Sequence, residues 1–365
     1  MEKEKQQEKP IDIEKYLEEE AAKLNNIIHE SLTVMSSDRS IEKLLGRSGY
    51  KYDPEALKKS IVEPALYLLE LGGKRWRPTL MLATIEALGR NPADFVEFAL
   101  IPEIIHNATL IHDDMEDRSL TRRGHPAVHI KYGEDVAINL GDFMMYFPVL
   151  ALMDSAKLSP KEKDAMLSIY IREMTHVTVG QATDIAWHND FVNVSRITEE
   201  NYLQMAFDKT GVLARVACKL GAVLGGADDK TIDTLGRFGA TIGVAFQLQD
   251  DILNIYPSKV SMSKGGVGED ITEGKITMLV IVALRKAREA DKKRLLEILV
   301  MHTRDQKLID EAIAIIDAQG SREYVTNVAS SLISNSWAEV DGILPQSRAK
   351  NVLRALSEFL VSRSR

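Results

Sequence analysis

Residues 99–117 read ALIPEIIHNATLIHDDMED. Apolar residues recur in this segment at steps of three and four positions, which is typical of a helix with one side in a protein core. A polar stripe runs along the same helix and consists of Glu103, His106, Asp113 and Asp117. The charges of Asp113 and Asp117 repel each other unless cations lie between them. The segment therefore predicts a core helix whose acidic end opens into a cavity.

A second acidic pair occurs far along the chain, in residues 243–255, which read GVAFQLQDDILNI. Polar residues again fall one helical turn apart, at Gln247, Asp250 or Asp251, and Asn254. One such pair alone is also compatible with a polar network in the core, but two pairs can face each other only across the interior of a bundle. Carboxylates without cysteines or a histidine pair suit Mg²⁺ better than Zn²⁺. Since Mg²⁺ commonly binds through one or two carboxylates plus substrate phosphates, the two helices predict a metal-diphosphate site.

Three loops carry clustered Lys or Arg, although the chain as a whole is acidic. They span residues 71–78 (LGGKRWRP), 118–129 (RSLTRRGHPAVH) and 257–275 (PSKVSMSKGGVGEDITEGK). Any one of them is equally compatible with a solvated basic surface. Loops held by a rigid scaffold are where function tends to lie, and three basic loops together favour an anionic ligand.

The composition limits the class of protein. The 365 residues include 54 Asp and Glu against 46 Lys and Arg, and the net charge of −8 argues against nucleic acid or an anionic membrane surface as the main partner. The longest uninterrupted apolar run, Met278 to Leu284, is far shorter than the roughly 20 residues of a membrane-spanning helix. The single cysteine, Cys218, excludes an internal disulfide and permits a reducing compartment. We therefore expect a cytoplasmic protein with no membrane span.

Helical periodicity dominates the chain, and strand-like alternation is rare. No Pro- or Ser-rich linker, change of composition or repeat divides residues 50–365. The prediction is therefore a single all-α domain over residues 11–365. Residues 1–10 (MEKEKQQEKP) alternate in charge without an apolar segment and are expected to be disordered.

These motifs resemble those of the trans-isoprenyl diphosphate synthases, in the order and approximate spacing of that family. The segments that carry the resemblance are GGKRWRP at 72–78, HNATLIHDDMED at 106–117, RRG at 122–124, Lys209-Thr210, FQLQDDILN at 246–254 and the loop 264–275. The family condenses an allylic diphosphate with isopentenyl diphosphate, in an all-α bundle around a central cavity. The resemblance therefore implies a chain-elongating prenyltransferase, usually a homodimer, of the geranylgeranyl diphosphate synthase or polyprenyl synthetase type.

The resemblance also implies a role for each matching residue. Catalysis would depend on about three Mg²⁺ ions, or Mn²⁺ in their place, held by Asp113, Asp117 and Asp250 with support from Asp114 and Asp251. The allylic diphosphate would bind Arg122, Lys209, Lys264 and Lys275. The isopentenyl diphosphate would bind Lys74, Arg77, His106 and Arg123, and the reaction centre would be lined by Thr210 and Gln247.

Two details bear on metal binding and on product length. The family's second motif commonly ends in Asp, whereas this chain has Asn254, and an amide is a weaker metal ligand than a carboxylate, so a metal contact at Asn254 is left open. In the family, bulky aromatic residues four or five positions before the first aspartate of the first motif stop the product at C15. This chain has Thr109 and Ala108 there, which implies an open tunnel and a C20 product, geranylgeranyl diphosphate.

Other functions stay open beside this prediction. The product could be farnesyl diphosphate or a longer polyprenyl diphosphate. A class I terpene cyclase also ionises a diphosphate with aspartate-rich helices, but it would not need Lys74, Arg77, His106 and Arg123. A non-catalytic subunit of a heteromeric synthase would be expected to lose the aspartates, which are intact here.

Overall fold

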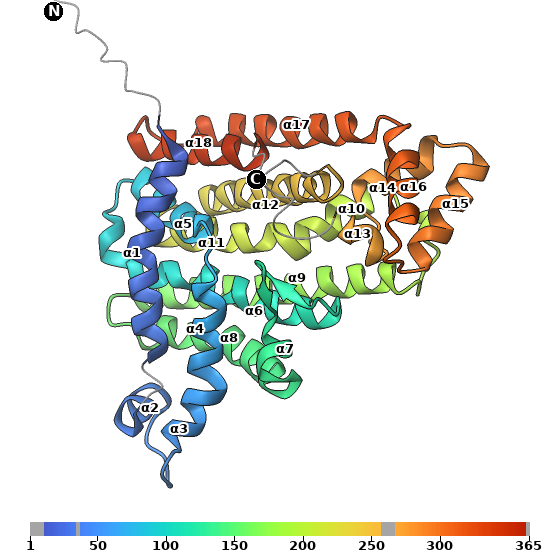
Figure 1. Ribbon diagram of the computed structural model, residues 1–365. Coiled ribbons are helices and arrows are strands. Elements are labelled where there is room, and N and C mark those ends of the chain that lie inside the picture. The colour runs from blue at the N-terminus through green and yellow to red at the C-terminus, as the bar shows by residue number, and fades with distance from the viewer. Residues whose placement is uncertain (1–10, 34–36, 257–266, 363–365) are drawn as a thin grey trace, which may run out of the picture.

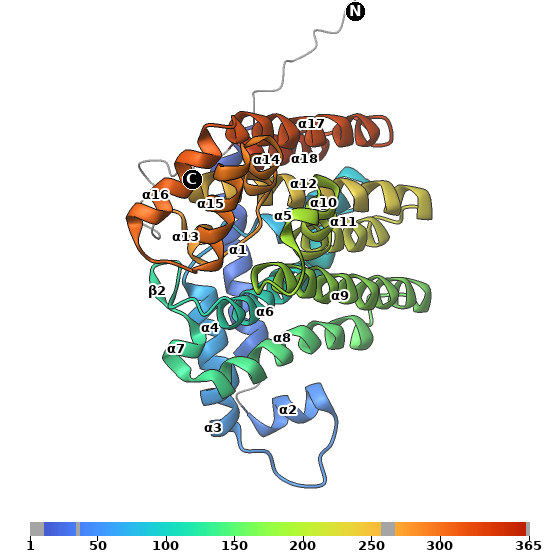
Figure 2. The ribbon, with the colours of Figure 1, turned by 90° about the vertical axis from the view of Figure 1, so that its right-hand side faces the viewer.

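Long helices stacked in layers make up the computed structural model, which describes residues 11–33, 37–256 and 267–362 (Figures 1 and 2). The predicted all-α class is confirmed. Within the described ranges the only strands are β1 (Thr121–Arg122) and β2 (His125–Pro126), which pair antiparallel. The expectation of disorder for residues 1–10 lies outside the described residues.

The elements follow one another along the chain with short connections. The first half contains α1 (Ile13–Thr33), α2 (Asp38–Leu45), α3 (Pro54–Leu57), the π-helical turn η2 (Lys58–Val62), α4 (Glu63–Glu70), α5 (Trp76–Ala87), the 3₁₀ segment η3 (Pro92–Ala99), α6 (Leu100–Glu116), α7 (Val128–Tyr132) and α8 (Glu134–Asp154). The second half contains α9 (Pro160–His188), η4 (Val194–Arg196), α10 (Glu199–Ala206), the π-helical turn η5 (Phe207–Gly211), α11 (Val212–Leu224), α12 (Asp229–Ile255), α13 (Glu269–Thr272), α14 (Met278–Lys286), α15 (Glu289–Val300), α16 (Gln306–Asp317), α17 (Ser321–Asp341) and α18 (Arg348–Ser362).

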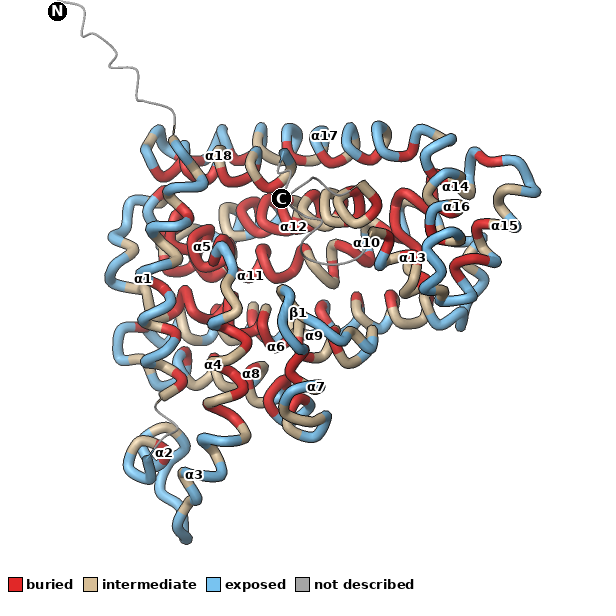
Figure 3. Tube along the Cα trace, in the orientation of Figure 1, coloured by how far each residue is buried: buried red, intermediate tan, exposed pale blue. Residues whose placement is uncertain are grey.

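Helix α11 lies at the centre of the bundle, against α5, α9 and α12. Its sequence, VLARVACKLGAVL, is apolar on almost every side, and a helix of that kind is stable only when neighbours surround it. Figure 3 shows α11 and the adjoining part of α12 as largely buried, whereas the outer side of α17 is exposed. The main core cluster reaches from Leu17 of α1 to Leu360 of α18, so both ends of the described chain pack on this centre.

Helices α8 and α9 present an apolar outer face. Side chains exposed on them include Ile138, Tyr146, Met153, Ile171 and Val179. Of the helices described, α8 is the one whose length and composition would suffice to cross a membrane, and 33% of its most apolar window is buried. Exposed apolar side chains gathered on two helices that contact each other are typical of an interaction face.

Candidate active site

The acidic turn of α6 lies where that helix leaves the core. Ile104 and Ile111 are buried, whereas Asp113 is partly exposed. The side chain of Asp114 is only 1% exposed and accepts a hydrogen bond from Nε of Arg122 at 2.8 Å. Burial raises the pKa of Asp114, and the guanidinium of Arg122 opposes that rise. Because Arg122 belongs to β1, this pair ties the basic 118–129 loop to the acidic turn.

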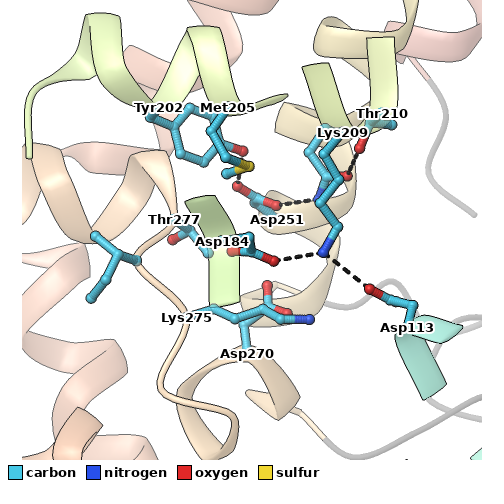
Figure 4. Close-up of a pocket in the computed structure, with 12 residues that line it drawn as sticks. Asp113, Asp184, Tyr202, Met205, Lys209, Thr210, Asp251, Asp270, Lys275 and Thr277 are labelled. Carbon is cyan, nitrogen blue, oxygen red and sulfur yellow. Dashed lines mark hydrogen bonds and ion pairs between the residues drawn. The ribbon is translucent and has the colours of Figure 1, made fainter. Parts of the chain in front are cut away.

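Lys209 approaches the acidic turn from the π-helical turn η5. This turn is pressed between α9 and α12, since a side chain at Gly180 would collide with the backbone of Lys209, and a Cβ at Gly243 would lie 2.6 Å from Cα of Gly211. A π turn adds a residue to the helical repeat and so changes which side chains point inward. Lys209 reaches inward and places its Nζ 3.0 Å from Oδ1 of Asp113 (Figure 4).

Asp184 of α9 is the second partner of Lys209, at 2.6 Å from its Nζ (Figure 4). Burial opposes charge at all three groups, but their mutual attraction prevails. The pKa of Lys209 is raised by Asp113 and Asp184. The pKa of Asp113 is held well below its usual range by Lys209, Lys275 and Arg122. The cluster is therefore ionised at neutral pH and supplies fixed charges to its surroundings.

The wall opposite α6 is a hydrogen-bonded chain on α12. Thr210 donates from Oγ1 to Oε1 of Gln247 at 2.8 Å, and Nε2 of Gln247 donates to Oδ1 of Asp251 at 2.9 Å. The hydroxyl of Tyr202 donates to the other oxygen of Asp251. Burial, together with the charge of Asp250, raises the pKa of Asp251 to about 7, although these hydrogen bonds oppose the rise. Asp250 is partly exposed and lies outside the lining of the cavity described below.

Lys275 closes the site from a third side. Its Nζ lies 2.7 Å from Oδ2 of Asp117 and 2.7 Å from Oε2 of Glu273. Burial opposes its charge, but the carboxylates of Asp113, Asp117 and Glu273 raise the pKa of Lys275. The other lysine predicted in this loop, Lys264, lies outside the described residues.

These groups surround a cavity of about 110 Å³ (Figure 4). Its lining comprises Asp113, Asp184, Tyr202, Met205, Lys209, Thr210, Gln247, Asp251, Asp270, Lys275, Ile276 and Thr277. The two acidic helices found in the sequence thus contribute to one cavity, through Asp113 of α6 and Asp251 of α12. Asp117 is linked to the cavity through Lys275, which lines it, and Asp114 is linked through Arg122, which lies 3.8 Å from Oδ2 of Asp113.

A second basic cluster lies beside the first, around His106. Burial and the guanidinium groups of Arg77, Arg123, Arg122 and Arg75 together hold the pKa of His106 well below its usual value. Within the described residues, the buried Nδ1 of this imidazole has no hydrogen-bond partner. Several positive charges around a neutral ring with an unused nitrogen favour an anionic ligand.

The loop 71–78 supplies the other side of this second cluster. The guanidinium of Arg77 lies over the ring of Trp76, 4.3 Å from its centroid, and Arg123 donates to the main-chain carbonyl of Gly72. Nζ of Lys74 lies 3.8 Å from Oε1 of Glu14 on α1 and 4.6 Å from the ring centroid of Phe359 on α18. Of the four residues predicted for the isopentenyl diphosphate, His106, Arg77 and Arg123 lie in one region outside the cavity lining, whereas Lys74 contacts α1 and α18.

Three polar residues that line the cavity are not predicted by the sequence analysis: the carboxylates Asp184 and Asp270 and the phenol of Tyr202. Asp184 and Tyr202 are single polar residues on helices, where the periodic pattern does not distinguish a buried group from a solvated one. Asp270 lies within the basic loop 257–275. A carboxylate among those basic residues is the feature of the sequence that could have indicated its role.

The donor set of the cavity fits a hard cation. All the candidate ligands are carboxylates, and the buried Oδ2 of Asp114 has no hydrogen-bond partner within the described residues. No three His, Cys, Asp or Glu side chains in that part of the chain converge on one point. Lysines lie on Asp113 and Asp117 instead. This arrangement suits an ion that takes one or two carboxylates and completes its shell with phosphate oxygens and water.

Comparisons with known proteins identify the relatives of this chain. The family model described as polyprenyl synthetase matches residues 58–316. The short chain isoprenyl diphosphate synthase of Methanothermobacter thermautotrophicus is 35% identical over 84% of this chain and 91% of its own length. The solved geranylgeranyl pyrophosphate synthetase of Pyrococcus horikoshii superposes with a TM-score of 0.81 at 31% identity, covering 96% of this chain and 100% of that one. The geranylgeranyl pyrophosphate synthase of Corynebacterium glutamicum, solved with isoprenyl diphosphate and magnesium, gives a TM-score of 0.79 at 25% identity over 97% and 100% of the two chains.

Proposed function

The chain belongs to the polyprenyl synthetase family and is a prenyltransferase, and we propose that it joins isopentenyl diphosphate to allylic diphosphates of C5 to C15 to yield geranylgeranyl diphosphate. The observation that carries the proposal is the cavity in which Asp113, Lys209 and Asp251 meet beside a second basic cluster. Two anion sites next to each other are what a reaction between two diphosphates needs.

We assign the first cavity to the allylic diphosphate. When its C–O bond breaks, the electron pair stays on the departing diphosphate, whose negative charge grows. Lys209, Lys275 and Arg122 are ionised and already held in place, so they stabilise that charge more in the transition state than in the ground state. Asp184 and Asp113 keep Lys209 in position for this role.

We assign Mg²⁺ to the carboxylates in and around the same cavity, with Mn²⁺ as a substitute. The residues that would hold it are Asp113, Asp117 and Asp250, supported by Asp114 and Asp251. Bound Mg²⁺ supplies positive charge that neutralises the leaving diphosphate. The two lysines that now lie on Asp113 and Asp117 would then turn toward the phosphate oxygens.

We assign the second basic cluster to the isopentenyl diphosphate. Lys74, Arg77 and Arg123 would bind its phosphates, and neutral His106 would contribute a hydrogen bond from its unused ring nitrogen. The double bond of this substrate attacks the allylic carbon, a carbon–carbon bond forms, and a proton is lost. No protein side chain is assigned as the base, because the departing diphosphate can take that proton. Thr210 and Gln247, which are hydrogen-bonded to each other, would line the reaction centre.

The test that distinguishes a prenyltransferase from a terpene cyclase compares diphosphate release with and without isopentenyl diphosphate. The purified protein is incubated with Mg²⁺ and farnesyl diphosphate, and inorganic diphosphate release is followed with and without the second substrate. A prenyltransferase releases diphosphate only when isopentenyl diphosphate is present. Rapid release without it, together with a cyclic hydrocarbon, would assign the chain to the cyclases.

Product length is predicted to respond to Ala108→Phe. Ala108 is fully buried one turn before Asp113 and packs in a core cluster with Leu140 and Met144 of α8. A phenyl ring there would block the path of the growing chain between α6 and α8, so the main product is expected to shift from C20 to C15. Overpacking costs about 1–3 kcal/mol of stability, which a thermal melt monitors. A folded variant with unchanged product length, measured by chromatography of the dephosphorylated alcohols, would place the tunnel elsewhere.

We infer that the apolar face of α8 and α9 is covered by a second copy of the chain. A homodimer would bury the exposed Ile138, Tyr146 and Ile171 without requiring another partner. Such a protein would need no membrane span and no nucleic acid, and we propose that it works as one domain over residues 11–365 in the cytoplasm.

Tyr146→Glu is predicted to weaken that dimer. Tyr146 is 74% exposed, so glutamate at this position is tolerated in the monomer but would place a charge in the apolar interface. Light scattering coupled to gel filtration is expected to show a dimer for the wild type and more monomer for the variant. Tyr50→Glu is the matched control, because Tyr50 is 90% exposed and lies outside this face. A monomeric wild type would contradict the assignment of the face.

A further inference from the structure

Asn254 ends the acidic motif of α12, and its hydrogen bonds lead to another segment of the chain. Its side-chain Oδ1 accepts a hydrogen bond from the main-chain N–H of Asp270 at 3.1 Å. Its main-chain carbonyl accepts a second one from the N–H of Gly268 at 3.0 Å. Asn254 therefore holds the first residues of a segment that we call the 268–275 turn.

The 268–275 turn is itself tightly bonded. The N–H of Lys275 donates to the carbonyl of Asp270 at 2.8 Å, and the side chain of Ile271 is buried in the core. Gly274 has a φ of 70°, and a Cβ there would lie 2.7 Å from Cε1 of His302, so this end has no freedom to move aside. The hydrogen bond that holds the N–H of Asp270 in place therefore also sets the backbone position of Lys275.

This turn brings two charged groups into the allylic cavity. Both Asp270 and Lys275 line it (Figure 4), and Lys275 is paired with Asp117 across the site. Within the described residues, the carboxylate of Asp270 has no hydrogen-bond or ion-pair partner of its own. It also faces the charge of Asp251. Burial and the charge of Asp251 raise the pKa of Asp270, and Lys275 opposes that rise, so a further cation at this place would favour the ionised carboxylate.

We propose that Asn254 is a positioning residue, which holds the 268–275 turn so that Asp270 supplies a metal-binding carboxylate from the side of the cavity. The proposal rests on the proposed function, since the cation it concerns is the one that accompanies the allylic diphosphate. It also accounts for an amide at position 254. Three carboxylates already lie near position 254: Asp250 and Asp251 within one turn of it on α12, and Asp270 on the turn that it holds. An amide oxygen accepts the same main-chain hydrogen bond without adding a negative charge.

Position 254 is tested with two substitutions of similar size. Asn254→Leu removes the side-chain acceptor, whereas Asn254→Asp keeps an oxygen in its place. Loss of a hydrogen bond that orients a ligand costs about 10- to 100-fold in metal affinity or activity. We expect Asn254→Leu to raise KM for farnesyl diphosphate by about tenfold and to leave KM for isopentenyl diphosphate unchanged. Asn254→Asp is expected to restore the value for farnesyl diphosphate, which a merely structural defect would not do.

Hydrogen–deuterium exchange gives a readout that does not depend on activity. Amides of the 268–275 turn are expected to exchange faster in Asn254→Leu than in the wild type and to stay protected in Asn254→Asp. Equal exchange in the wild type and Asn254→Leu would overturn the tether, whatever the kinetics.

Position 270 is tested by metal binding. Binding of Mn²⁺ in the presence of inorganic diphosphate, followed by electron paramagnetic resonance, is expected to weaken about 10- to 100-fold in Asp270→Asn. Glu269→Gln is the matched control, because Glu269 belongs to the same turn but is exposed and outside the cavity lining. Unchanged Mn²⁺ affinity in Asp270→Asn would overturn the role of Asp270. Tighter Mn²⁺ binding by Asn254→Asp than by the wild type would place the ligand at position 254 and overturn the division of roles.

The wild-type protein separates this inference from the proposed function. A wild type that does not condense the two diphosphates counts against the proposed function. A wild type that condenses them, with an Asn254→Leu variant that has the same KM values and the same exchange rates, counts against the inference alone.

Discussion

Lys209→Ala is expected to lower kcat by about 100- to 1,000-fold, which is the loss seen when one fixed group is removed from a developing negative charge. The ammonium of Lys209 lies between Asp113 and Asp184 and points into the allylic cavity. Because it is ionised and held before substrate arrives, its contribution requires no rearrangement in the transition state. Steady-state kinetics with farnesyl and isopentenyl diphosphates measures the loss, and KM for isopentenyl diphosphate should change little.

Lys219→Ala is the matched control for the loss of a lysine from a buried carboxylate. Lys219 lies on α11, 3.0 Å from the buried carboxylate of Glu173, and outside the cavity lining. Both variants should melt at lower temperature, since each leaves a buried carboxylate without one of its cations. Only Lys209→Ala should lose kcat. Equal losses of kcat in both variants would mean that stability, rather than charge in the cavity, determines the rate.

Asp113→Asn is the second substitution for which we expect a loss of about 100-fold or more in kcat/KM. The variant removes the carboxylate proposed for Mg²⁺ and also one of the two partners of Lys209. The concentration of Mg²⁺ that gives half-maximal rate should therefore rise together with the loss of rate. Titration of Mg²⁺ at saturating substrates measures both quantities.

Glu116→Gln provides the control within the same helical turn. Gln181 donates to Glu116 and, at 3.3 Å, to Oδ1 of Asp113, so both carboxylates share one neighbour. Glu116 does not line the cavity, and its replacement should leave the Mg²⁺ dependence unchanged. An Asp113→Asn variant with the Mg²⁺ requirement of the wild type would contradict the assignment of Asp113 as a ligand.

The sequence predicted the fold class and the convergence of two acidic helices, because both depend on local spacing. Helical period and residue type place Asp113 on one core helix and Asp251 on another. That these carboxylates share a cavity follows from packing two such faces across one bundle interior, whereas only the family resemblance indicates Lys209 for the same site.

Other features depend on contacts that spacing does not encode. The π turn η5 forms where Gly180 and Gly243 let neighbouring backbones approach, which requires knowledge of which helices touch. Asp184 looks like a solvated residue in the sequence of α9 and becomes a buried partner of Lys209 only in the folded chain. For Asn254 the sequence raised the right question, and the answer is a hydrogen bond to a segment that begins 14 residues later in the chain.

The apolar face of α8 was also missed. The longest uninterrupted apolar run in the sequence is Met278–Leu284, and the structure shows that it is buried apart from its last residue. In α8, Pro148 and scattered polar residues break the apolar sequence into shorter runs, so this criterion does not detect that helix. Exposure of apolar side chains is a property of the assembled bundle, so only the structure distinguishes a core helix from a helix with an apolar outer face.

The measurement that bears most directly on the account is the length of the product made from labelled isopentenyl diphosphate and each of the C5, C10 and C15 allylic diphosphates in the presence of Mg²⁺. We predict that all three primers yield a C20 diphosphate as the main product and that chelation of the metal stops its formation. Failure to condense any of the primers would contradict the assignment of the two anion sites to the two diphosphates.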